Sequence, residues 1–249
     1  SLSGAAFSTL ALILQISALF IAPLILVQPI GASALVITAI INARVTKTKL
    51  NQASITAIAF CTIGLGAFVV MAHQVAVEPE IDDQNLVYIL IMAASLIAIF
   101  GTVLLRGATR YKPLTFIVGA GVLYGFVASL TKVVLKRLFN QGGWDRIFSG
   151  QIDLYTELLT LVALIAMLSA AFMGGWFVQN AYTSGPPDLV IAGLTVIDPL
   201  IAVSIGFVLL NEAMDASWLF SLGFVASGAI AVVGVYLLSK VHPELAKKS

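Results

Sequence analysis

The chain has 249 residues, of which 60% are apolar and only 10% are charged, and its mean hydropathy is +1.05. Ordinary soluble domains are about 45–50% apolar and about 25% charged. This composition argues against a soluble enzyme, a nucleic-acid-binding protein, a disordered protein and a secreted disulfide scaffold, because so few charges cannot cover so much apolar surface. A lipid bilayer is therefore the expected solvent.

Uncharged runs divide the chain into segments that are long enough to cross a bilayer, which takes about 20 predominantly apolar residues. The first 43 residues carry no charge and hold two such segments, split at Ala22-Pro23. The predicted helices cover residues 5–21, 24–43, 52–74, 85–105, 113–135, 154–181, 187–210 and 217–239. The expected fold class is an all-α polytopic membrane bundle with eight spans.

The charged loops predict the orientation of these spans. Basic residues gather in loops 44–51 and 106–112 and in the C-terminal tail, whereas loop 75–84 is acidic. Because positive loops face the cytoplasm, we expect a multi-pass protein of the cytoplasmic membrane with a cytoplasmic C-terminus. Loop 136–153 carries charges of both signs and is expected outside, as a short interfacial helix or a folded loop.

Two parts of the chain resemble each other. Gln15 lies eight residues before Pro23, and Gln28-Pro29 follows; Gln179 lies eight residues before Pro187, and Asp198-Pro199 follows. The charge rule orients the two copies oppositely, and inverted repeats are a hallmark of secondary transporters. We expect residues 1–74 to form a first repeat, residues 75–112 a linking transmembrane helix, and residues 113–249 a second, inverted repeat.

Three segments carry a resemblance to a known family. Residues 121–132 and the proline-containing stretch 197–212 resemble helices of the drug/metabolite transporter superfamily, EamA-like branch, and residues 22–29 are similar to NIPA-like magnesium transporters. The resemblance implies that each half starts with a helix like 113–135. It therefore implies a further helix before residue 5, and nine spans in all.

Asp198 is the most prominent single residue, about eleven residues into a predicted span and so at a depth of about 16 Å. A carboxylate at the centre of a span costs at least about 2.5–3.5 kcal/mol. It must face a partner, a cavity or water, or be protonated. Pro199 beside it loosens the helix and frees carbonyl groups. We interpret Asp198 as a site for a coupling proton or a cation, with a neutral carboxyl hydrogen-bonded inside the bundle as the alternative.

Other polar residues within the spans are candidates for the same pathway. Gln28, before Pro29, is the inverted counterpart of Asp198. The amides of Gln15, Gln179 and Asn180 either bind a polar solute or tie helices together. Tyr124 lies near the middle of its span, where its hydroxyl group needs a partner, and gate, solute contact and packing all remain open for it.

Lys132 and Glu157 lie near the outer ends of neighbouring spans. They either pair as an outer gate, or Lys132 extends its amine toward the membrane surface. Glu212 lies at an outer helix end, where an acid is usually solvated. Glycines at 121 and 125 form a GxxxG motif, and Gly223 with Ser227 forms a second pair of small residues, which are expected to serve helix packing.

Three hypotheses for function follow. The first is a secondary transporter for a small solute that works by alternating access, with or without proton coupling. The second, which the NIPA-like resemblance implies, is a divalent-cation (Mg²⁺) transporter or channel, and the third is a non-transport scaffold in a larger complex. We expect no enzyme activity, no catalytic residues, no cofactor and no metal site. The expected partners are the bilayer and a solute, proton or cation, but no nucleic acid; a homodimer or a membrane complex stays open.

Overall fold

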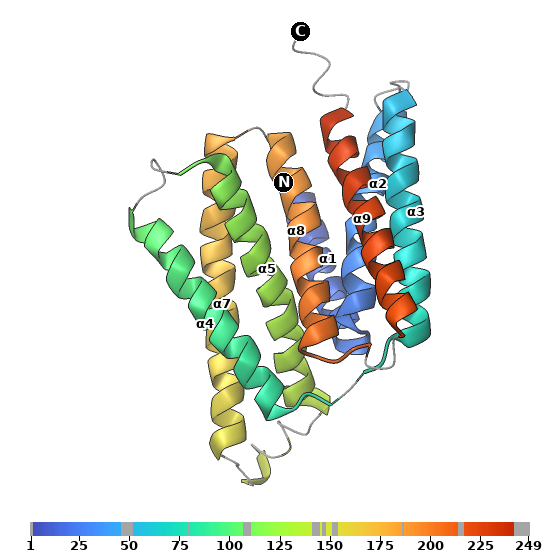
Figure 1. The fold of residues 1–249 in the computed structure, drawn as a ribbon. Coiled ribbons are helices and arrows are strands. Elements are labelled where there is room, and N and C mark those ends of the chain that lie inside the picture. Colours follow the sequence, from blue (N-terminus) through green and yellow to red (C-terminus); the bar gives the residue numbers. More distant parts are fainter. Residues whose placement is uncertain are drawn as a thin grey trace.

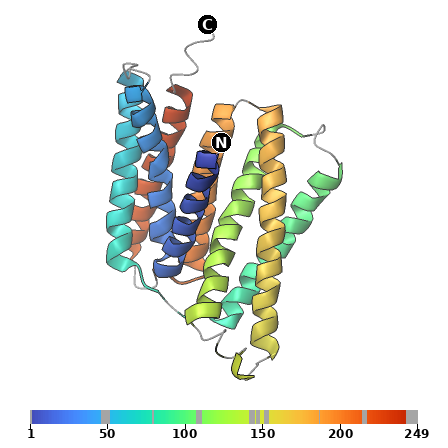
Figure 2. The same ribbon diagram turned by 180° about the vertical axis from the view of Figure 1, so that it is seen from behind.

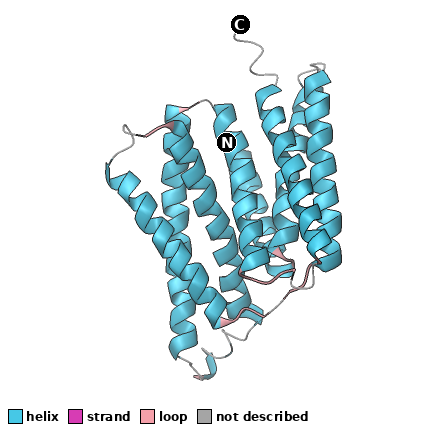
Figure 3. Cartoon of the chain, in the orientation of Figure 1, coloured by secondary structure: helices cyan, strands magenta, loops and turns pink. Residues whose placement is uncertain are grey.

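The computed structural model describes residues 2–45, 52–78, 80–106, 111–140, 145, 148–150, 154–185, 187–213 and 217–241. These residues form helices joined by short connections, without any strand (Figure 3). In chain order the long helices are α1 (Leu2–Ile21), α2 (Leu24–Val45), α3 (Gln52–Val75), α4 (Asp83–Arg106), α5 (Pro113–Leu135), α7 (Leu154–Ser184), α8 (Pro187–Val208) and α9 (Trp218–Val241). The expected all-α fold class is confirmed.

Every predicted span coincides with one of these helices. The largest differences are at the start of α1, at residue 2 instead of 5, and at the end of α7, at residue 184 instead of 181. Local sequence explains several starts: α5 begins at Pro113, where the missing N–H group costs nothing. The predicted break at Ala22-Pro23 separates α1 from α2.

Four helical stretches in the described ranges are long and apolar enough to cross a bilayer: Ile55–Val75, Asp83–Arg106, Pro113–Phe139 and Glu157–Ser184. Four shorter apolar stretches accompany them: Thr9–Ile21, Leu24–Ala34, Gly193–Val208 and Trp218–Gly234. Large apolar side chains such as Leu105 and Phe172 are exposed on the outside of the bundle. These features indicate a membrane protein.

Successive long helices run in opposite directions, so the connections fall at two ends of the bundle (Figures 1 and 2). The lower end in Figure 1 holds the α1–α2 and α3–α4 connections, the start of α7 and the α8–α9 connection. Helix α9 ends at the upper end. At the lower end α5 continues into the π-helix η2 (Lys136–Asn140), where the sequence suggested a folded loop or an interfacial helix; residues 141–144, 146–147 and 151–153 of that loop lie outside the described ranges.

Glycines allow α3 and α9 to approach along their lengths. A side chain at Gly64 would lie 2.9 Å from the carbonyl oxygen of Ser227, and one at Gly234 would lie 2.9 Å from the Cβ atom of Cys61. Both positions also meet backbone atoms of the opposite helix. Backbone contact of this kind is how small residues join helices in a bilayer.

The predicted GxxxG motif joins α5 to α8 in the same way. A side chain at Gly121 would meet Ile197. A side chain at Gly125 would meet Ile201 and would lie 3.0 Å from the carbonyl oxygen of Asp198. The packing interpretation of this motif is confirmed. Its consequence is that the middle of α8, including Asp198, is held directly against α5, while α4 packs on the outside of α5 and α7.

Candidate functional site

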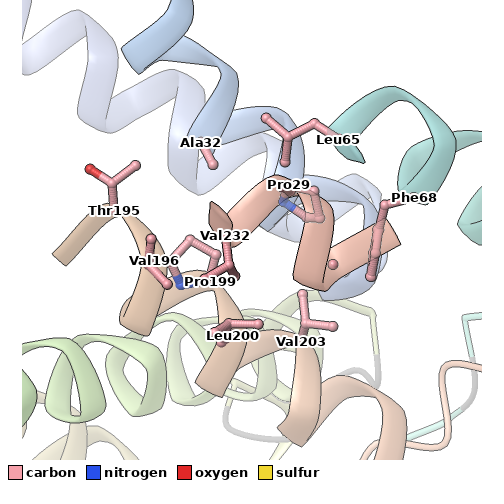
Figure 4. Close-up of a pocket in the computed structure, with 12 residues that line it drawn as sticks. Pro29, Ala32, Leu65, Phe68, Thr195, Val196, Pro199, Leu200, Val203 and Val232 are labelled. Atoms are coloured by element: carbon pink, nitrogen blue, oxygen red, sulfur yellow. The ribbon is translucent and has the colours of Figure 1, made fainter. Parts of the chain in front are cut away.

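The two prolines inside helices, Pro29 of α2 and Pro199 of α8, line the same pocket (Figure 4). The pocket has a volume of about 60 Å³ and an apolar wall. The other lining residues come from α2, α3, α8 and α9: Ala32, Leu65, Phe68, Thr195, Val196, Leu200, Val203, Gly228, Ala231 and Val232. Residues that the sequence paired as counterparts therefore meet inside the bundle.

A proline cannot donate a helical hydrogen bond, so the carbonyl group four residues earlier loses its usual partner. These carbonyl groups belong to Ile25 and Thr195. Each helix thus carries a local interruption beside the pocket. In membrane proteins such interruptions occur where the freed groups face protein or a cavity.

The residue before each proline has a buried polar atom without a hydrogen-bond partner in the described structure. On α2 this atom is Nε2 of Gln28, whose side chain is only 5% exposed. On α8 it is Oδ1 of Asp198. Buried polar groups are nearly always hydrogen-bonded. A donor and an acceptor left open at matching positions of two contacting helices are groups that a polar ligand, water or a proton can satisfy.

Tyr124 lies on the α5 side of Asp198. It is within electrostatic range of the Asp198 carboxyl group. Its ring lies against the glycine pair of α7, because a side chain at Gly174 would lie 3.4 Å from the ring and one at Gly175 would lie 3.8 Å from the hydroxyl oxygen. The side chain is half-buried. Gate, solute contact and packing were the open interpretations for Tyr124, and this contact with α7 supports packing.

The other amides lie apart from this site. Gln179 is exposed, and Nδ2 of Asn180 donates to the carbonyl oxygen of Trp176 in its own helix, at 2.7 Å. Gln15 is exposed on α1 and lines a second pocket, of about 580 Å³, with residues of α2 and α3, among them Gly31 and His73. The structure therefore does not bring Gln15, Gln179 and Asn180 together with Asp198.

A largely buried network of charges lies at the lower end of the bundle. Lys132 of α5 is 2% exposed, and its Nζ atom lies 2.6 Å from Oε1 of Glu78 and 2.8 Å from Oε1 of Glu212. The same amine donates to the carbonyl oxygen of Ala22, at 2.9 Å. One cation thus joins the α1–α2 connection, the segment after α3 and the segment after α8.

Glu212 is 1% exposed and caps the start of α2. Its Oε1 atom accepts a hydrogen bond from the backbone N–H of Leu24 at 2.9 Å, and its Oε2 atom accepts one from Ile25 at 3.0 Å. The first N–H groups of a helix have no partner within the helix, and the positive end of the helix dipole favours a carboxylate there. The Glu212 side chain therefore satisfies two backbone donors and one cation at once.

The chain around Glu212 folds back to place this carboxylate inside. Asn211 adopts a left-handed backbone with φ of 56°, and the Glu212 N–H donates to the carbonyl oxygen of Gly206 at 3.0 Å. A side chain at Gly206 would lie 2.6 Å from Oε2 of Glu212, so only glycine leaves room there. The Glu212 carbonyl oxygen accepts from the N–H of Val77 at 2.9 Å.

Two more cations of the same helical run are buried beside this network. Lys136 pairs with Oε2 of Glu78. Arg137 is 2% exposed; it pairs with Asp83 at 2.6 Å and donates to the hydroxyl oxygen of Thr160 at 2.9 Å. The three basic side chains at the end of α5 and in η2 are thereby matched by carboxylates.

This network corrects two sequence expectations. Lys132 pairs with Glu78 and Glu212 instead of Glu157, and it does not extend to the surface; Glu157 has an interaction of its own. Glu212 is buried and not solvated. Sequence reasoning missed Glu78 and Glu212 because pairing across α2, α5 and α8 depends on how distant segments meet. One signal for this network was present in the sequence. Lys132 and Lys136 are one helical turn apart, at the end of the bundle that also holds the acidic residues.

Among the residues that the structure describes, no three His, Cys, Asp or Glu side chains gather as a metal site would require. A protein of Corynebacterium glutamicum, described as uncharacterized, is 23% identical to this chain over 222 residues, which cover 87% of the chain and 72% of that protein. No family model and no solved structure matches the chain.

Proposed function

We propose that this protein is a secondary transporter that moves a small polar or amphipathic solute across the cytoplasmic membrane by alternating access. The solute pathway passes the second turn of α2, at Gln28, and the middle of α8, at Asp198. The observation that carries the proposal is the pair of open, buried polar atoms on Gln28 and Asp198, each beside a helix-interrupting proline. An ionisable residue inside a membrane span is a functional-site hypothesis by default, and here one of its oxygens, Oδ1, is buried without a hydrogen-bond partner.

An inverted repeat is part of the proposal and fits this mechanism. The counterpart helices α2 and α8 run in opposite directions and contact each other, and so do α3 and α9. Both prolines reach one pocket. Transporters built from inverted repeats hold their solutes near the midplane, where broken helices of the two repeats meet. Rocking of residues 1–74 against residues 113–249, with α4 as the linking helix, is the corresponding motion.

The proposed orientation places the upper end of the bundle in the cytoplasm, with eight spans in this chain. Arg44, Arg106 and Lys112 are exposed at that end, as the positive-inside rule expects. Basic residues of loops 46–51 and 107–110 and of the tail lie outside the described ranges. At the opposite end, three cations are buried in ion pairs. Membership of the drug/metabolite transporter superfamily is part of this proposal and rests on the resemblance of residues 22–29, 121–132 and 197–212.

The experiment is a proteoliposome uptake screen across solute classes, with and without a pH gradient, on the full chain and on Asp198→Asn. The asparagine keeps the shape of the side chain but cannot carry a proton or a negative charge. We expect uptake of a polar solute by the wild type and loss of gradient-driven uptake in Asp198→Asn. A variant that keeps full gradient-driven uptake would contradict the role of Asp198.

A magnesium arm in the same screen separates the second hypothesis, because Mg²⁺ flux without any organic solute would replace the transporter proposal by a cation pathway. Magnesium is held in proteins by one or two carboxylates and several waters. Absence of flux for every solute and ion in well-folded protein would favour the scaffold hypothesis instead. Glu80→Gln is the matched control, because Glu80 is exposed and lies far along the chain from both interrupted helices.

A further inference from the structure

We infer that Lys132 and Glu212, together with Glu78, form the lock that holds the transport pathway closed at the lower end of the bundle. The inference concerns the regulation of the pathway proposed above and rests on it. The bonds of Glu212 with Leu24 and Ile25 and of Lys132 with Ala22 join the two halves of the chain, and Glu78 lies in the linking segment 75–112. Lys132 and Glu212 belong to residues 113–249, whereas Ala22, Leu24 and Ile25 belong to residues 1–74.

The geometry makes the lock a single unit. One oxygen of Glu212, Oε1, accepts from the Leu24 N–H and also lies 2.8 Å from the Lys132 amine, so the charge that caps α2 is held in place by Lys132. Lys132 in turn holds the Ala22 carbonyl oxygen and Glu78. Separation of the two halves at this end therefore breaks the bonds of Glu212 with Leu24 and Ile25 and the bond of Lys132 with Ala22 together.

The lock also lies in line with the pathway. Gly125, Ser129 and Lys132 follow one another at helical spacing on one face of α5. A side chain at Gly125 would lie 3.0 Å from the carbonyl oxygen of Asp198, Ser129 is fully buried, and Lys132 is part of the lock. A route from the lower end to Asp198 along this face is blocked first by the lock and then by Ser129.

The arrangement around Arg137 provides a contrast within the same end. Arg137 binds Asp83 and Thr160, so these two contacts join η2 to α4 and to α7. Neither of the two contacts reaches residues 1–74. The ion pair of Arg137 with Asp83 is of similar length, at 2.6 Å, and its arginine is equally buried, although Asp83 is 36% exposed. It does not cross between the halves, and it is the matched control for the lock.

The test is labelling of a cysteine at position 129 by a membrane-impermeant thiol reagent added from the side of the lower end. The background variant Cys61→Ala removes the other cysteine, and Ser129→Cys is nearly isosteric. We expect little labelling with the lock intact, at least a fivefold faster labelling in Glu212→Gln, and no change in Asp83→Asn. Equal labelling rates in Glu212→Gln and in the intact protein would overturn the lock.

Gly206→Ala provides a second variant that leaves every charge in place. Its methyl group would displace the Glu212 carboxylate sterically, and faster labelling is expected again; Gly101→Ala, which meets open space, is its control. Thermal unfolding of each variant identifies those that do not fold. Because labelling needs no solute, an accelerated rate without transport of any solute would sustain the lock and contradict the proposed function. Transport of a solute together with unchanged labelling rates would support the proposed function and contradict the lock.

Discussion

Lys132 of α5 and Glu212 after α8 form a buried ion pair of 2.8 Å, although 80 positions separate them in the chain (212 − 132). Both side chains are shielded from water, since they are only 2% and 1% exposed. Buried charges are tolerated when paired and hydrogen-bonded. Here the pair is completed by the N–H groups of α2 and by Glu78, so its strength depends on several segments at once.

Replacement of Glu212 by glutamine should destabilise the protein by up to about 3–5 kcal/mol, the cost of leaving a buried positive charge uncompensated, because Lys132 and Lys136 would then share the carboxylate of Glu78. The glutamine keeps one oxygen for the N–H groups of α2 but removes the negative charge that holds Lys132. Thermal unfolding in detergent measures the effect. Glu80→Gln, which removes an exposed acid in the segment between α3 and α4, should change stability by less than about 0.5 kcal/mol. Similar losses in both variants would contradict the burial argument.

A double-mutant cycle should show that Lys132 and Glu212 act as a unit. Lys132→Met and Glu212→Gln are each expected to be destabilising, and the double variant should lose less than the sum of the two. The expected coupling energy is about 1–3 kcal/mol, the upper part of the range for residues in one ion-pair network. Lys132→Met combined with Asp83→Asn is the control pair, for which additive losses of stability are expected. Additive losses in the Lys132–Glu212 pair as well would contradict the model of one unit.

Gly64→Ala should weaken the contact of α3 with α9, whereas Gly66→Ala should be tolerated. A methyl group at Gly64 would meet the backbone of Ala231 and Ser227, which cannot move aside as a side chain end can. Nothing lies within 4 Å of the corresponding position at Gly66. Overpacking of this kind typically costs about 1–3 kcal/mol. Unfolding midpoints of the two variants give the answer, and equal midpoints would contradict the close approach.

Gly125→Ala should disturb transport more than its effect on stability alone would explain. The added methyl group would lie 2.6 Å from Cβ of Ile201 and 3.0 Å from the carbonyl oxygen of Asp198, so α8 must shift beside its proline. Uptake of the solute found in the screen is the readout, compared with Gly101→Ala, whose methyl group meets open space. Normal uptake in a folded Gly125→Ala protein would show that the register of α5 on α8 is not critical.

Reporter fusions test the proposed orientation and the number of spans. A reporter that is active only in the cytoplasm should be active at the C-terminus, and one placed at Gly150 should be inactive. Gly150 has a left-handed backbone with φ of +73° and lies in an exposed connection before α7, so it tolerates a fusion better than a helix would. Activity of the reporter at both positions would contradict the alternation of spans.

The sequence by itself determined the solvent and the helices of this protein. Apolar runs of membrane length predicted each of the eight helices, because in a bilayer every backbone group must be satisfied within its own segment and a long apolar run has no other stable form. Prolines marked the interruptions of α2 and α8 and the starts of α5 and α8 for the same local reason. Asp198 and Gln28 could be singled out since polar groups inside such runs are rare.

Only the tertiary structure decided which polar groups are satisfied and which are left open. Glu212 looked like a solvated helix-end acid, and Lys132 like a partner of Glu157, because sequence separation within one repeat was the only guide. In the fold, the start of α2 meets the end of α8 and presents two N–H groups to Glu212. Ion pairs between distant segments depend on where several helix ends meet, and local sequence does not encode that meeting point. The same packing left Nε2 of Gln28 and Oδ1 of Asp198 without hydrogen-bond partners, which distinguishes the proposed pathway from the proposed lock.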